Sequence, residues 1–189
     1  DGAVNMATTA LVTGVLTTTA TTVFNGGFTS NDGSTITTAD NTDTLTLTST
    51  DADALSSPNL VLYRNSGSPA DSDQLGYIHF KGRNDNSQDV TYYKILSNIA
   101  DASDGTEDAN VQHQIMTGGT LQNYLSMNSG EVVINDGSID LDFRVESNGG
   151  THMLFVDGGN NAVIIGTDNS AGNLDGASLG VAGGVTLFQ

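Results

Sequence analysis

The sequence has 189 residues, of which 22 are acidic and 5 basic, so its formal net charge is −17 at pH 7. Such a chain repels phosphate groups, and five basic residues cannot build a large basic face, so we expect no nucleic-acid partner. No apolar run approaches the ~20 residues that span a bilayer, so we expect no membrane insertion. The chain holds no cysteine, which excludes disulfides, thiolate metal ligands and a thiol nucleophile from it.

The polar residue types favour strands and turns over helices. The acidic residues are 19 Asp and only 3 Glu, and the chain has 24 Thr, 23 Gly and 18 Asn. Asp, Asn and Gly favour turns, and Thr is β-branched, whereas the residues that favour helix interiors are scarce. The composition therefore predicts an all-β fold of short antiparallel strands and excludes an all-helical one.

Changes in composition along the chain indicate three zones. Residues 1–50 are a Thr-rich N-terminal β segment, suited to attachment or strand exchange. Residues 51–135 are a central antiparallel β module, in which turn residues recur every 8–12 positions. Residues 136–189 are a C-terminal β module with a tail of small residues.

Alternation of apolar and polar residues predicts the strands within these zones. Leu45 and Leu47 share one face of an early strand, and Ile78 and Phe80 share one face of a central strand. The predicted strands cover residues 43–49, 60–64, 77–82, 90–99, 111–116, 121–127, 132–134, 139–146, 152–156 and 162–165.

Several runs resemble modules of tailed-phage fibre proteins, in particular those of marine phages. Two runs of the central zone resemble the shaft modules of these fibres: residues 76–85 (GYIHFKGRND) and 99–108 (IADASDGTED). Residues 143–147, 154–158 and 161–167 are similar to the module that often precedes the terminal chaperone region. The resemblance covers roughly residues 8–167, and no chaperone or peptidase region is recognisable in the chain.

The resemblance implies an elongated virion fibre protein, on the phage tail or particle surface, that contributes to host-receptor contact. Its implied fold has short antiparallel strands, meanders and β-helix-like windings, intertwined as a homotrimer. Its implied partners are further copies of itself, other virion structural proteins and a host surface receptor. The residues that would bind the receptor are not identified.

Trimerisation also follows from the shape of the predicted strands. Each strand offers one narrow apolar row, and such rows cannot enclose a core within one elongated chain. We expect copies of the chain to bury these rows against one another around an axis. The trimer-core candidates are Leu45, Leu47, Ile78, Phe80, Ile139, Leu141, Phe143 and Val145.

Neither catalysis nor a cofactor is expected. Residues 101–108 hold four carboxylates, which makes Asp101, Asp104, Glu107 and Asp108 weak calcium candidates, but their spacing misses the EF-hand pattern. A solvated hairpin turn explains this loop better, so we expect no metal site. A glycosidase needs two facing carboxylates, commonly beside aromatic platforms, and the chain has no Trp.

Two other functions remain open at this stage. The chain could be a subunit of a secreted bacterial filament or adhesin, whose Thr-rich N-terminal segment completes the sheet of a neighbour. It could also be a capsid head fibre or decoration protein, which differs from a tail fibre only in its point of attachment. The symmetry of the assembly separates a closed trimer from an open filament.

Overall fold

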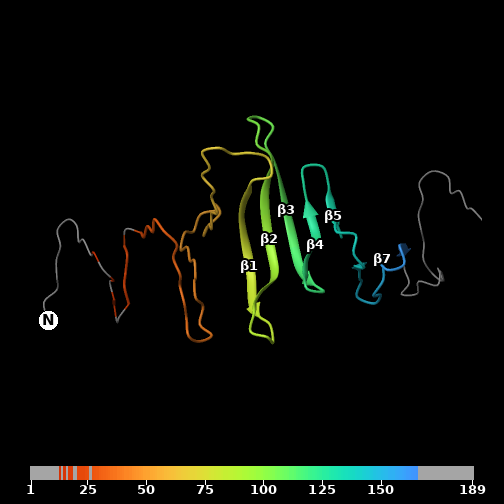
Figure 1. The fold of residues 1–189 in the computed structure, drawn as a ribbon, viewed down its shortest axis with the longest axis horizontal. Coiled ribbons are helices and arrows are strands. Elements are labelled where there is room, and N and C mark those ends of the chain that lie inside the picture. Colours follow the sequence, from red (N-terminus) through yellow and green to blue (C-terminus); the bar gives the residue numbers. More distant parts are fainter. Residues whose placement is uncertain (1–12, 14, 16, 19–20, 26, 166–189) are drawn as a thin grey trace, which may run out of the picture. The chain divides into compact units, whose positions relative to one another are not determined.

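The structure is a computed structural model that describes residues 13, 15, 17–18, 21–25 and 27–165. The chain divides into two units, one ending at Asn59 and the other beginning at Leu60. Every strand among the described residues lies in the second unit, and none of these residues is helical (Figure 1). The prediction of an all-β fold is thereby confirmed. No helix in the described part of the chain could cross a membrane.

The first sheet is a five-stranded antiparallel meander in sequence order. A two-residue turn of Gly118 and Gly119 joins the third and fourth strands, and both glycines have the positive φ angles that such a turn requires. The strands are β1 (Gln74–Arg83), β2 (Asp89–Asp101), β3 (Asp108–Thr117), β4 (Thr120–Met127) and β5 (Val132–Ile134). They fall where alternation and turn residues predicted them.

The second sheet has three short antiparallel strands in sequence order, β6 (Phe143–Val145), β7 (Leu154–Asp157) and β8 (Ala162–Ile165). The predicted strand over residues 139–146 is therefore shorter than expected. The residues before β6 lie instead against the turn between β7 and β8, where the Gly158 amide donates to the Asp142 carboxylate at 3.0 Å.

Gly158 approaches the backbone of Leu141 too closely for any side chain. A Cβ atom there would lie 2.6 Å from the Leu141 carbonyl oxygen and 2.8 Å from its nitrogen. We expect Gly158→Ala to destabilise the second sheet by about 1–3 kcal/mol, as overpacking does, and to lower the melting temperature. Gly149→Ala is the control, because nothing lies within 4 Å of its added Cβ. Equal melting temperatures for the two variants would contradict the close contact.

Two predicted strands, over residues 43–49 and 60–64, are absent from the sheets. Both have the expected apolar residues, but a strand exists only when its backbone pairs with another strand. No other segment of the described chain pairs with either of them, so Leu45 and Leu47 remain exposed.

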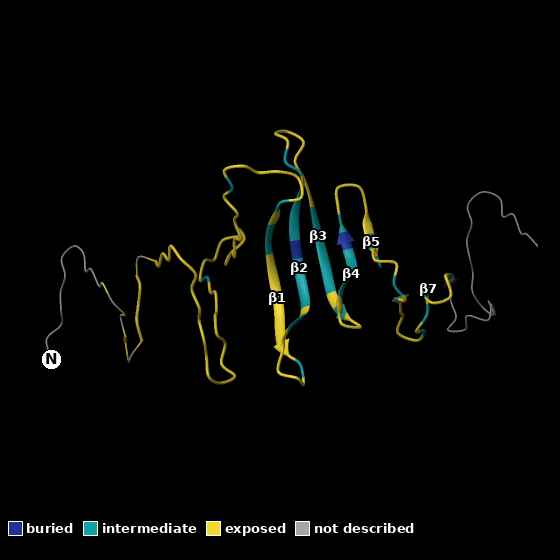
Figure 2. Cartoon of the chain, viewed as in Figure 1, coloured by how far each residue is buried: buried dark blue, intermediate teal, exposed yellow. Residues whose placement is uncertain are grey.

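Very little apolar surface is buried within the described residues. Leu96 on β2 and Ile164 on β8 are their buried apolar side chains, and none of the described side chains is completely enclosed. Figure 2 shows how little is buried: short dark segments on β2 and β4, at Leu96 and the polar Ser126, in a sheet that is otherwise half-buried or exposed. Since burial of apolar area drives folding, one copy of these sheets lacks the usual source of stability.

Candidate functional site

One face of the five-stranded sheet is almost entirely apolar or aromatic. Residues that pair across neighbouring strands point to the same face, so the pairing register defines the rows of side chains on each face. We call this surface the first apolar face. Its rows are Ile78–Ile95–His113–Leu125–Ile134, Phe80–Tyr93–Ile115–Gln122 and Ser97–Val111–Met127–Val132.

The first apolar face carries no Asp, Glu, Lys or Arg in these rows, in a chain with 27 such residues. Its rings contact one another, with Phe80 and Tyr93 centred 5.4 Å apart. The Tyr93 hydroxyl and the His113 Nδ1 atom share a hydrogen bond of 2.6 Å. The face is nevertheless open, since Phe80 is 55% exposed and Val132 67%. Among the strands of the described chain, none from the second sheet packs over it as a second layer.

The opposite face of the sheet is mixed. It carries the buried side chain of Leu96, together with Met116 and Leu121, beside a group of hydrogen-bonded polar side chains. The Gln114 amide donates to Gln112 at 3.2 Å and to Asn123 at 2.7 Å. The Lys94 ammonium lies 5.5 Å from the centre of the Tyr77 ring. Polar and charged side chains share this face with apolar ones, whereas the rows of the first apolar face hold no charged side chain.

The second sheet repeats this pattern on a smaller scale. Residues in register on one side form the second apolar face, with rows Phe143–Val156–Val163 and Val145–Leu154–Ile165. All six residues are apolar, and Val145, Val156 and Val163 are exposed. The other side carries Phe155 and the buried Ile164 in register with Arg144, which pairs with Glu146 at 2.7 Å. The second sheet therefore also presents an uncovered apolar surface.

A hollow of about 470 Å³ is lined by residues from both apolar faces. Ile134, at the end of β5, comes from the first face, and Phe143, Val156 and Val163 come from the second. Leu141 lines it as well. The end of the first apolar face and part of the second therefore line one concave surface.

Six of the eight trimer-core candidates lie on these surfaces. Two are on the first apolar face and two on the second, and two others line the hollow. They are, in that order, Ile78, Phe80, Phe143, Val145, Ile139 and Leu141. Leu45 and Leu47 belong to the first unit, which has no sheet among its described residues.

The candidates from sequence omitted the centre of the first apolar face, which β3 supplies. The signal was present, because Val111, His113 and Ile115 alternate with Gln112 and Gln114. Pairing β3 between β2 and β4 is what turns this alternation into part of a continuous face.

The loop of weak calcium candidates is organised by its own hydrogen bonds. The Asp101 carboxylate accepts from the Ser103 amide at 2.8 Å and from the Thr106 hydroxyl at 3.2 Å. The bonds from Ser103 are the main cause that lowers the pKa of Asp101. Glu107 accepts from the Gly105 amide at 3.1 Å. The described residues contain no group of three His, Asp or Glu side chains placed to hold a metal ion.

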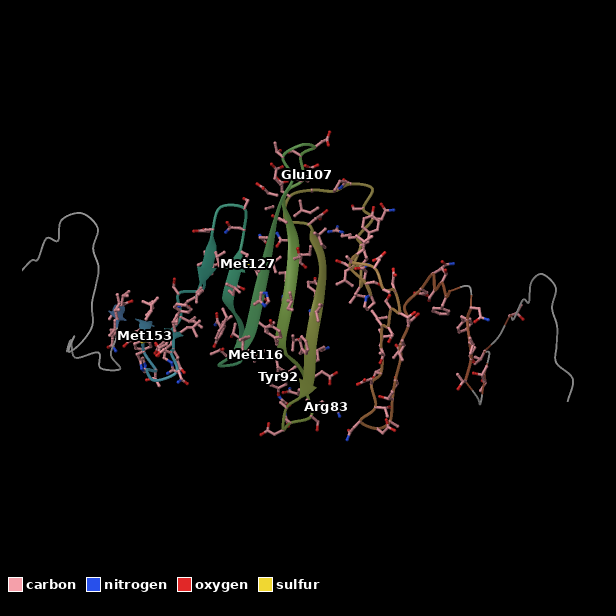
Figure 3. The ribbon with its side chains drawn as sticks, turned by 180° about the vertical axis from the view of Figure 1, so that it is seen from behind. Arg83, Tyr92, Glu107, Met116, Met127 and Met153 are labelled. Carbon is pink, nitrogen blue, oxygen red and sulfur yellow. The ribbon has the colours of Figure 1, made fainter. Side chains whose placement is uncertain are left out.

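Two further hollows lie at opposite ends of the five-stranded sheet. One, of about 620 Å³, is lined by Tyr92 and Met116, with the single carboxylate of Asp89. Asp89 forms an ion pair with Arg83 at 3.4 Å. The other, of about 300 Å³, lies beside the acidic loop that contains Glu107. Figure 3 shows Arg83, Tyr92 and Met116 at one end of the sheet and Glu107 at the other.

No family model matches this sequence, and the searches of curated proteins and of solved structures find nothing similar to it. The resemblance to modules of phage fibres stays a prediction.

Proposed function

We propose that the chain is a structural virion fibre protein, of a phage tail or appendage, that assembles as a homotrimer through its apolar faces. The observation that carries the proposal is the first apolar face, which is exposed, free of charged side chains and rich in aromatic residues. A single copy leaves that face in water, and apolar area gains about 25 cal/mol per Å² when it is buried.

The charge pattern favours further copies of the same chain as the partner. A chain of net charge −17 repels its own copies, so association requires surfaces that bring no carboxylates together. The two apolar faces meet that requirement, because their rows contain no acidic residue. The opposite sides of the two sheets, which carry the charged side chains of Lys94 and Arg144, would face outward.

The number of copies and the finer shape come from the resemblance to phage fibre modules. Three copies around an axis, elongated and intertwined with β-helix-like windings, would bury the apolar rows against each other. The function is then mechanical and adhesive, because the fibre projects from the particle and carries a surface toward the host receptor. The proposal includes no catalytic residue and no cofactor.

Light scattering coupled to size-exclusion chromatography tests the assembly directly. We expect one species with three times the 19.5 kDa mass of the chain, persisting as the protein is diluted. The trimer should unfold in one cooperative step, because the folded single copy is not populated. A compact, folded species of 19.5 kDa would overturn the proposal. A broad distribution of large masses would instead favour the filament alternative.

A further inference from the structure

A run of four large apolar residues lies ten residues ahead of the five-stranded sheet in the chain and is exposed to water. Leu60, Val61, Leu62 and Tyr63 are 66%, 76%, 53% and 78% exposed. All four residue types have at least moderate β propensity, and residues 60–64 are a predicted strand. In the structure, none of the backbone groups of residues 60–63 bonds to another backbone group of the described chain.

The segment is nevertheless held at the edge of the sheet. The Arg64 guanidinium donates to the Gln74 carbonyl oxygen at 3.1 Å and pairs with the Asp73 carboxylate at 3.0 Å. The Leu62 side chain lies against Gly76, 3.6 Å from the position of an added Cβ. Residues 60–63 therefore lie beside the start of β1, an edge strand, with their own backbone unpaired (Figure 1).

The opposite edge of the sheet is also open. Among the residues that the structure describes, β5 pairs with β4 alone, and its exposed residues Val132 and Ile134 are apolar. A closed threefold ring uses heterologous contacts, in which two different surfaces of the chain meet. In such a ring, the β1 edge of one copy can lie next to the β5 edge of the following copy.

We propose that residues 60–63 form a β-strand with a second copy of the chain, pairing along the outer edge of its β5. This inference rests on the proposed homotrimer and names the segment that crosses between copies. Neither residues 60–63 nor β5 carries an acidic side chain, so the contact adds no charge repulsion. Backbone pairing would bury the exposed run and would cover a sheet edge otherwise prone to aggregation.

Cross-linking tests whether residues 60–63 lie beside β5 of a second copy. Because the chain has no native cysteine, only the introduced cysteines can react. Val61→Cys and Leu62→Cys are each combined with Val132→Cys and treated with a short bis-maleimide. Side chains opposite one another on paired strands have Cβ atoms about 5 Å apart, so intermolecular products are expected. The control combines Val61→Cys with Asp85→Cys in the β1–β2 turn and should give none. The mass of every variant is first measured by light scattering.

Hydrogen exchange of the wild-type assembly tests the pairing itself. Amides in residues 60–63 and on β5 should exchange at least about a hundredfold more slowly than in an unpaired chain. Assembly with fast exchange in residues 60–63 and no cross-link above the control would overturn this inference but leave the trimer standing. Slow exchange without a link to Val132 would place the strand elsewhere on the neighbour and also overturn it. A monomeric wild type would overturn both proposals.

Discussion

Ile95→Asp is expected to abolish assembly. Ile95 lies in the central row of the first apolar face, in register with Ile78 on one side and His113 on the other. Burial of an unpaired carboxylate costs several kcal/mol, and each additional copy in the assembly adds another such charge. A cost of about 4 kcal/mol per copy weakens association about a thousandfold. Light scattering should therefore show loss of the trimer at micromolar concentration.

The matched control for this variant is Gln112→Glu, which adds the same charge to the opposite face of the same sheet. The Gln112 side-chain oxygen accepts a hydrogen bond from the Gln114 amide, and a Glu carboxylate can still accept it. Gln112→Glu should keep the wild-type mass and lose little stability. Equal effects of the two variants would show that added charge alone, and not burial of this face, disrupts the assembly.

The local pattern of the sequence predicts most of the strands but not their faces. Alternation and turn residues place β1 to β5 correctly because strands and tight turns are set by neighbouring residues. Where β3 pairs with β4, however, the register shifts, because His113 pairs with Leu125 and the next residue, Gln114, pairs with Asn123. The extra residue on β4 makes Leu121 and Leu125 point to opposite faces. Their spacing of four positions alone would place them on the same face. Such a bulge depends on how the strand pairs, which alternation does not encode.

The candidate site was also only partly predictable from local sequence patterns. Ile139 and Leu141 were predicted as part of a strand, yet they line a hollow ahead of β6 because the turn at Gly158 packs against Leu141. The alternating residues 43–49 were predicted as a strand, yet no partner exists for them among the described residues. A sequence pattern indicates what a segment can pair with, whereas tertiary contacts decide whether the partner is present.

Phe143→Asp is expected to abolish assembly and folding of the second sheet together. Phe143 begins β6, lies in register with Val156 and lines the hollow that also contains Ile134 of the first apolar face. The substitution removes a large ring, a change that costs about 3–5 kcal/mol in a buried site. It also places a carboxylate in an apolar hollow. The lost packing and the added charge therefore both destabilise the second sheet. Light scattering and the melting temperature report them together.

Asp142→Asn is the control at the neighbouring position. The Asp142 carboxylate accepts a hydrogen bond from the Gly158 amide, and the side-chain oxygen of Asn can accept the same bond. This variant should assemble and melt nearly as the wild type does, because only a surface charge is lost. Phe143→Leu, which keeps an apolar side chain in the hollow, should retain the assembly with a lower melting temperature. A Phe143→Asp variant that keeps the trimer mass would show that the second apolar face is not buried between copies.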